Sequence, residues 1–413
     1  MSFRLSRMAL LAGAVFCLPL SVSCVSSAQA ADVLSPAVGK PLQAAQAALA
    51  AHNYAKAMAA VNDADAIKGK NDYESYTIDQ MRAAVAAQSG DVAAATSAYD
   101  KLIASPRTPK DAKAQMMMAE ATMAYTAKDY AHAIPAIERY LKQAGPNEQM
   151  ETLLVQSYYL QKDFKNAARV QQTMIDETIR AKKVPTENQL QLLATCQSQM
   201  KDTGAMTHTY VLLATYYPKP EYWALLLHGL VTNPKLPPAL QLDVYRIRLA
   251  AGNLTATGDF MDATEIAMQM GLPQVALNIM NQGYASGALG KDAGAAREAK
   301  LKALVVKTVE DKKASADSDA AAAAQAPSGN ALITAGYNYV TFGQVDKGLD
   351  LIRQGIAKGP FDVNVAKLRL GEAQMDGGRV ADAITTFGTV EGDNGARDIA
   401  ELWALKLKSA AKK

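Results

Sequence analysis

The sequence predicts an all-α protein built from a row of helical hairpins. The 413-residue chain is 49% hydrophobic but only 6% aromatic and is rich in alanine, which favours helices that pack through small residues over a sheet. A small residue followed four positions later by a larger one also recurs about every 35 residues along most of the chain. A single hairpin of this kind cannot bury its apolar face alone, so neighbouring hairpins must stack.

The first thirty residues differ from the rest and indicate a secretory signal peptide. Arg4 and Arg7 precede an apolar run over residues 8–20, and small residues then lead to an Ala-Gln-Ala triplet that ends at Ala30. A charged start, a short apolar centre and an A-x-A end predict cleavage after Ala30. We therefore expect a periplasmic or secreted protein.

Two alternatives for this segment are an uncleaved membrane anchor and a lipoprotein attached through Cys24. A lipoprotein signal usually carries leucine three residues before the modified cysteine, and this chain has Ser21 at that position. The cleaved signal peptide is therefore the preferred interpretation.

Cleavage would leave a nearly neutral chain with one cysteine. The segment 1–30 contains two arginines and no acidic residue, so its removal lowers the formal net charge from +3 to +1. A chain of this charge has no whole-protein attraction for nucleic acid or for an anionic membrane. Only Cys196 remains, which excludes an intramolecular disulfide. No later apolar run is long enough for a membrane span, so we expect no transmembrane segment after cleavage.

The hairpins can be followed through the small residue of each second helix and the larger residue four positions later. The successive intervals between the small residues are 38, 38, 34, 39, 35, 35, 72 and 35 residues, and the interval of 72 spans two hairpins, of which one is degenerate. The pairs are Ala57 and Val61, Ala95 and Tyr99, Ala133 and Ile137, Ala167 and Gln171, Met206 and Tyr210, Gln241 and Tyr245, Ala276 and Met280, Gly348 and Ile352, and Ala383 and Phe387.

The clearest unit has Leu370-Gly371 on its first helix and Ala383 and Phe387 on its second. These residues and spacings resemble the tetratricopeptide repeat (TPR) family, whose unit is about 34 residues of two antiparallel helices. The resemblance covers residues 42 to about 410 and implies a right-handed α-solenoid of about ten TPR-like helical hairpins. Gln374 stands where the family has a tyrosine, and several units lack the Leu-Gly pair. Another helical-hairpin solenoid of similar repeat length is the alternative.

Two interruptions suggest how the array is organised. Five prolines between Tyr217 and Leu240 indicate boundaries between hairpins, because proline is tolerated at helix starts and connectors. The second interruption is residues 312–330, which combine charged residues, a run of alanines and a Pro-Ser-Gly end. This composition predicts a flexible segment that can be helical without packing tightly. The expected parts are a signal peptide (1–30), N-terminal TPR-like repeats (31–217), continued repeats (218–311), an Ala-rich flexible segment (312–330), and C-terminal repeats with a capping helix (331–413).

Residue types that carry catalysis or bind metals form no recognisable pattern. The four histidines are not paired with one another or with cysteine at the spacing of a zinc site. There is no phosphate-binding glycine loop and no G-x-S-x-G motif, and the carboxylates are scattered. Cys196 falls inside a predicted first helix, where a lone cysteine is usually a small buried hydrophobe. We therefore expect no enzyme, no metal and no cofactor.

The resemblance also implies a concave groove lined by the first helix of each hairpin. Counting back from the phased residues places polar, uncharged side chains and tyrosines in this groove. Amide groups can donate and accept hydrogen bonds along an extended peptide, and tyrosine adds apolar area with a polar tip. The predicted groove residues are Gln115, Thr122 and Tyr125 in the third unit, Gln149, Gln156 and Tyr159 in the fourth, and Asn188, Gln191 and Gln199 in the fifth.

These expectations favour a non-catalytic periplasmic scaffold that binds a protein or peptide of the cell envelope in its groove. A glycan- or cell-wall-associated envelope module is the alternative, because the same amide and tyrosine lining suits a sugar. A helical-solenoid enzyme would need an acid, base or nucleophile that the sequence does not reveal. The lining could also be a solvated helix face without a ligand.

Overall fold

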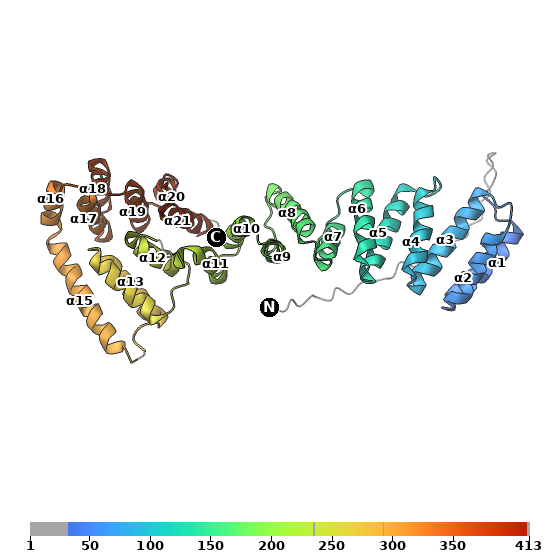
Figure 1. Ribbon diagram of the computed structural model, residues 1–413, viewed down its shortest axis with the longest axis horizontal. Helices are drawn as coiled ribbons and strands as arrows, with labels where there is room; N and C mark the ends of the chain where they lie inside the picture. Colours follow the sequence, from blue (N-terminus) through green and yellow to red (C-terminus); the bar gives the residue numbers. More distant parts are fainter. Residues whose placement is uncertain (1–31, 234–235, 292, 411–413) are drawn as a thin grey trace. The chain divides into compact units, whose positions relative to one another are not determined.

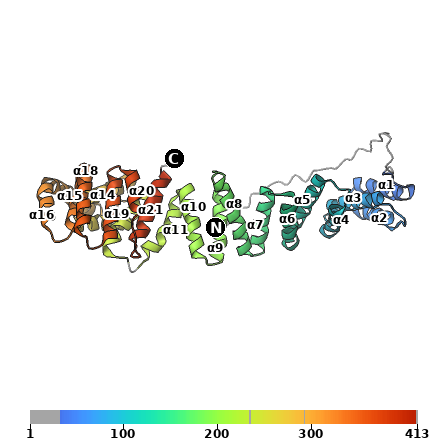
Figure 2. The ribbon, with the colours of Figure 1, turned by 90° about the horizontal axis from the view of Figure 1, so that it is seen from above.

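The computed structural model describes residues 32–233, 236–291 and 293–410 (Figures 1 and 2). In these ranges the regular elements are all helical, with twenty-one α-helices and one short 3-10 helix, η1. The predicted all-α array of hairpins is therefore confirmed, whereas the predicted signal peptide lies outside the described residues. The described residues divide into two compact units, with the boundary between residues 129 and 130.

The first unit is a row of helices in which each packs on the next. Its core joins the first three helices through Val38, Leu42, Val61 and Ile78, all buried. Asn71 begins the third helix with a capping box, since its side chain accepts from the Glu74 amide while the Glu74 carboxylate accepts from the Asn71 amide. The helices are α1 (Pro36–Ala50), α2 (Tyr54–Ala66), α3 (Asp72–Ser89), α4 (Val92–Ala104) and α5 (Lys110–Thr126).

The turn between the two helices of a hairpin has a repeated backbone conformation, in which one residue has a positive φ angle. Only glycine adopts this conformation without strain. Asp or Asn follows this residue in several turns and caps the second helix, as Asp163 does by accepting from the Asn166 amide at 3.1 Å. The positive-φ residues of these turns are Gly90, Gly271, Gly343 and Gly378, and also His52, Lys128, Lys162 and Lys201.

The second unit begins with five helices that pack consecutively on one another, followed by the proline-rich stretch. Pro220 is the first residue of α11 and Pro238 the first of η1, so both stand at helix starts as predicted. Gln241 does not hold the small-residue position, because it is exposed while Leu242 and Val244 are buried. The elements are α6 (Tyr130–Ala144), α7 (Glu148–Leu160), α8 (Phe164–Arg180), α9 (Glu187–Gln199), α10 (Thr203–Tyr216), α11 (Pro220–Val231), η1 (Pro238–Leu240) and α12 (Gln241–Ala250).

The remaining helices complete the second unit. Helices α15 and α16 occupy the place of the degenerate hairpin, and α16 packs on α17 with Ala323 buried. Residues 312–330 thus comprise the end of α15, all of α16, the connection to α17 and the first residue of α17, and their flexibility stays a prediction. The helices are α13 (Thr257–Gln269), α14 (Pro273–Ser286), α15 (Ala295–Ala314), α16 (Ala316–Gln325), α17 (Asn330–Thr341), α18 (Val345–Lys358), α19 (Val363–Asp376), α20 (Val380–Phe387) and α21 (Ala396–Ala410).

Helices α17 and α18 cross closely because glycines face each other at two levels. A Cβ atom on Gly336 would lie 2.5 Å from the carbonyl oxygen of Gly348, and a Cβ on Gly348 would lie 2.5 Å from that of Gly336. Gly329 and Gly355 form the second level, where a Cβ on Gly355 would lie 2.6 Å from the Gly329 oxygen. The backbones therefore approach to a distance that any side chain would prevent.

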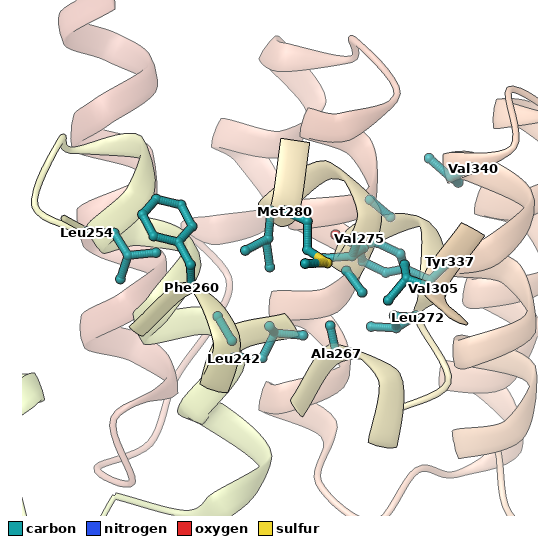
Figure 3. Packing of buried hydrophobic residues seen from close by; sticks show 14 of the residues in the cluster. Leu242, Leu254, Phe260, Ala267, Leu272, Val275, Met280, Val305, Tyr337 and Val340 are labelled. Carbon is teal, nitrogen blue, oxygen red and sulfur yellow. The ribbon is translucent and has the colours of Figure 1, made fainter. Parts of the chain in front are cut away.

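A hydrophobic core of the second unit joins α12–α14 to α17–α19 (Figure 3). Phe260 lies beside Leu254 at one side of the cluster, Met280 lies nearer its middle, and Tyr337 and Val340 of α17 lie at the other side. The C-terminal hairpins therefore pack against helices that precede them by many residues, in addition to their neighbours in sequence.

The last helix, α21, also makes long-range contacts. Its apolar side buries Ile399 and Trp403. It packs on α19 and α20, as a terminal capping helix would, but it also packs on α10 and α12 (Figures 1 and 2). The end of the chain thus returns to the middle of the second unit, which the repeat pattern did not predict.

Candidate functional site

Three of the predicted groove residues lie on α5, in the first unit. Gln115 is exposed, while Thr122 and Tyr125 are half-buried. The Thr122 hydroxyl donates to the Met118 carbonyl oxygen at 2.7 Å, one turn earlier in the same helix. The nine predicted residues are therefore divided between the two units, three in the first and six in the second.

The other six predicted residues lie on α7 and α9, the first helices of consecutive hairpins in the second unit. Helix α8 packs on both, so the six residues belong to one packed block. Amides and one tyrosine make up the whole set, and none of the six carries a charge. Three are exposed, namely Gln149, Asn188 and Gln199, and three are half-buried, namely Gln156, Tyr159 and Gln191.

Two of the half-buried residues are positioned by neighbouring helices. The Tyr159 ring meets the Phe164 ring edge to face, with centroids 5.6 Å apart, so the hairpin's own second helix holds it. Gln191 Nε2 donates to the Tyr222 hydroxyl on α11 at 2.6 Å, which ties α9 to the following hairpin. The donor group of Gln191 is therefore engaged within the protein.

The Tyr222 hydroxyl continues this connection to the start of α9. It donates to the Glu187 carboxylate, which also accepts from Lys219 Nζ at 2.6 Å. Burial, together with the hydrogen bond to Glu187, raises the pKa of Tyr222 to about 12. The hydrogen bonds from Lys219 and Tyr222 lower the pKa of Glu187. This network holds α9 and α11 in register beside the exposed amides.

The structure contains a second polar site that the sequence did not predict. It lies where α12, α17, α19 and α21 meet, and we call it the buried charge cluster. The carboxylates of Asp243 and Glu372 are fully buried, and the side chains of Arg369 and Arg246 are only 8% and 10% exposed. The cluster consists of Asp243, Arg246, Tyr337, Arg369, Glu372, Asp376 and Trp403.

Arg246 of α12 is the centre of one half of the cluster. Its Nη2 donates to both carboxylate oxygens of Asp376 at 2.9 Å, and its Nη1 donates to the Tyr337 hydroxyl at 2.6 Å. The guanidinium carbon lies 5.8 Å from the Tyr337 ring centroid and 5.9 Å from that of Trp403. Burial opposes the charge, but Asp376, Tyr337 and Glu372 outweigh it and raise the pKa of Arg246 well above its ordinary value.

Arg369 of α19 is the centre of the other half. Its Nη1 donates to the Asp243 carboxylate and, at 2.8 Å, to Glu372 Oε2. Its Nη2 donates to the Ala239 carbonyl oxygen in η1 at 2.8 Å. Burial opposes its charge, but Asp243 and Glu372 raise the pKa of Arg369 above its ordinary value. Arg369 therefore joins α19 to both η1 and α12.

Because the buried charge cluster lies inside the second unit, its role is to connect helices. No substrate can contact Asp243 or Glu372, because both side chains are fully buried. The cluster instead connects helices whose paired residues are 126 and 130 positions apart in the chain. The spacing Arg369-x-x-Glu372 and Asp243-x-x-Arg246 puts charges on one face of each helix. Those pairs were visible in the sequence, but nothing in it showed that α12 meets α19.

The one cysteine among the described residues lies outside both polar sites. Cys196 is buried as predicted, and burial raises the pKa of its thiol to about 11. Within residues 32–233, 236–291 and 293–410, no three His, Cys, Asp or Glu side chains gather as metal ligands. A search of the same residues finds no helix with the length and hydrophobicity to cross a membrane.

The described helices pair into consecutive hairpins, and the buried charge cluster fastens the C-terminal hairpins of the second unit to α12. No protein-family model matches the chain, and no curated protein matches it significantly. Among solved structures, the chain is similar to the TPR domain of P58(IPK), with 18% identity and a TM-score of 0.22 over 91% of this chain and 99% of that one. It is also similar to yeast Tom70, with 11% identity and a TM-score of 0.20 over 91% and 96% of the two chains.

Proposed function

We propose that this protein is a non-catalytic scaffold of the cell envelope that binds a protein or peptide partner along α7 and α9. The observation that carries the proposal is the set of uncharged amides that these two helices expose, Gln149, Asn188 and Gln199. A primary amide both donates and accepts hydrogen bonds, so a row of amides can pair with the backbone of an extended segment. Such pairing requires no charge on the partner, which suits the nearly neutral chain.

The hairpins on either side support this role by holding the two helices rigidly. Helix α8 packs on both, and the Gln191–Tyr222–Glu187 network ties α9 to α11. A surface that is already ordered loses little conformational entropy when a partner binds. The burial of Asp243 and Glu372 supports the non-catalytic part of the proposal, because it withholds this pair of neighbouring carboxylates from a substrate.

The proposed location rests on the sequence of residues 1–30 alone. Its basic start, apolar centre and Ala-Gln-Ala end support export to the periplasm with cleavage after Ala30. Mass spectrometry of the protein purified from its native cell envelope would give the mature N-terminus. Ala31 is the expected first residue, and a lipid-modified Cys24 would contradict this location and processing.

Photo-crosslinking in cells tests the binding surface. A photoreactive residue replaces Gln149 or Asn188, and a third variant carries it at Thr173, which is exposed on α8. We expect one protein to be captured from positions 149 and 188 but not from position 173. Equal capture from all three positions, or capture from position 173 alone, would contradict the assignment of α7 and α9 as the binding face.

The same variants distinguish a glycan ligand. If no protein is captured from positions 149 and 188 in a folded, exported chain, the partner is not a protein at this face. Retention of the purified chain on isolated cell-wall material, reduced by Tyr159→Ala, would then support the glycan-associated alternative. Tyr159→Phe is the matched control, because it keeps the ring contact with Phe164 and removes only the hydroxyl.

A further inference from the structure

Two fully buried carboxyl groups in the charge cluster share one arginine. Arg369 Nη1 donates both to Asp243 and to Glu372 Oε2, so the two carboxyl groups lie side by side. Each also has a second oxygen that accepts no hydrogen bond, namely Asp243 Oδ2 and Glu372 Oε1. Buried carboxylate oxygens are rarely left without a donor. A proton on Glu372 would convert one of these acceptors into a donor.

The charge balance of the cluster also favours one bound proton. Three carboxyl groups, those of Asp243, Glu372 and Asp376, face two guanidinium groups, those of Arg246 and Arg369. With every group ionised, the cluster has one uncompensated negative charge, which is costly because Asp243 and Glu372 are fully buried and only Asp376 is partly exposed, at 27%. A single proton on one carboxyl group makes the cluster neutral.

Glu372 is the group that takes this proton. Burial, followed by the charge of Asp243, raises the pKa of Glu372 to about 7, although Arg246 and Arg369 oppose the shift. The other polar, charged and aromatic groups of the cluster come from four helices. Helix α12 supplies Asp243 and Arg246, α19 supplies Arg369 and Asp376, α17 supplies Tyr337, and α21 supplies Trp403.

We propose that Glu372 is a proton-operated latch that fastens α19 and α21 to α12. With its proton, the cluster is neutral and the C-terminal helices stay closed on the middle of the second unit. When the proton leaves, the buried negative charge is uncompensated and the contact between α12 and α19 loosens. Because α21 packs on both α10 and α12, its release uncovers surfaces of these helices. This regulation goes beyond the proposed scaffold function and does not depend on it.

The sign of the pH dependence follows from the direction of the shift. The closed state holds the Glu372 proton more tightly than an open state, in which the carboxyl group has its ordinary pKa near 4.5. The closed state is therefore favoured most at acidic pH and loses this advantage as pH rises from about 4.5 towards about 7 and beyond. Between about pH 6 and about pH 8, the opening equilibrium should rise about tenfold.

Hydrogen exchange on the full mature chain, followed by mass spectrometry, measures this opening directly. After correction for the intrinsic effect of pH on amide exchange, we expect protection in α19 and α21 to fall about tenfold from about pH 6 to about pH 8. Helices α1–α4 serve as the internal reference, since they belong to the other unit. Constant protection of α19 and α21 over this range would overturn the latch.

Two substitutions separate a latch from a merely structural cluster. Glu372→Gln imitates the protonated acid, so protection should stay high and lose its pH dependence. Glu401→Gln, at an exposed position on α21, is the control and should keep the wild-type dependence. Should Glu372→Gln fail to fold, Asp243→Asn provides the second variant. Without the Asp243 charge, two carboxylates face two guanidinium groups, so the cluster is neutral with Glu372 ionised and protection should stay high as pH rises. Wild-type pH dependence in either variant would overturn the proposal.

Discussion

At the scale of single residues, Arg246 shows how strongly a buried charge depends on its partners. It donates two hydrogen bonds to Asp376 and one to Tyr337, and its Nη1 lies 3.1 Å from Glu372 Oε2. Its guanidinium also fills the space between the rings of Tyr337 and Trp403. Removing it would leave Asp376 without its guanidinium partner and Glu372 with that of Arg369 alone.

We expect Arg246→Ala to lower the free energy of unfolding of the second unit by about 3 kcal/mol or more, since breaking a buried ion pair strands a charge. Arg353→Ala is the control, because Arg353 pairs with Asp350 at 2.8 Å in an exposed position and should cost less than about 0.5 kcal/mol. Urea unfolding at neutral pH compares the two variants. Losses of equal size would show that the buried cluster contributes no more than a surface pair.

At the scale of elements, the α17–α18 hairpin depends on backbone contact between glycines. A methyl group on Gly336 would lie 2.5 Å from the Gly348 carbonyl oxygen and 2.7 Å from an atom of the Ile352 side chain. Because the first of these is backbone, the two helices must move apart to admit it. The nearby core residues Tyr337 and Val340 would move with α17.

Gly336→Ala should therefore destabilise the second unit by about 1–3 kcal/mol, the usual cost of overpacking. Gly229→Ala is the matched control in α11, where a Cβ atom meets nothing within 4 Å. It should stabilise the same unit by about 0.5–1 kcal/mol, because alanine favours the helix more than glycine does. Thermal unfolding followed by circular dichroism gives both values, and a stabilised Gly336→Ala would contradict the close crossing.

The elements also show what could be predicted from the sequence. The hairpins could be predicted, because the small residue of each second helix allows close packing against the first helix of the same hairpin. Most of these small residues are buried in the structure. Gln241 is the exception that is exposed, and it follows the proline-rich stretch that disturbs the spacing. The amides on α7 and α9 were placed in a groove by the resemblance to the TPR family, and the structure exposes three of these six predicted residues.

The buried charge cluster could not be predicted, because it depends on contacts between distant parts of the chain. Asp243 and Arg369 are 126 residues apart in the chain. Taken singly, each is indistinguishable from an ordinary charged residue on the polar face of a helix. A repeat pattern specifies how each hairpin meets the next, but not that α19 and α21 meet α12. The network that engages Gln191 was missed for a similar reason, since its partner Tyr222 lies in the following hairpin.

At the scale of the whole molecule, the last helix has consequences far from the end of the chain. Helix α21 packs on α10 and α12 as well as on its neighbours α19 and α20. Ile399 is fully buried and Trp403 is 4% exposed, so their removal would expose apolar surface on several helices at once. The first unit has its own core and is not part of these contacts.

A chain that ends at Gly395 should therefore lose stability in one unit only. Burial of Ile399 and Trp403 contributes about 1.5–3 kcal/mol each, so we expect the second unit to lose about 3–6 kcal/mol. Hydrogen exchange should show reduced protection in α10, α12 and α19, with that of α1–α4 unchanged. Lys408→Ala in the full chain is the control, because this exposed residue can change without loss of the core contacts. If α10 and α12 kept their full protection without α21, the return of the chain end to the middle of the second unit would contribute nothing to its stability.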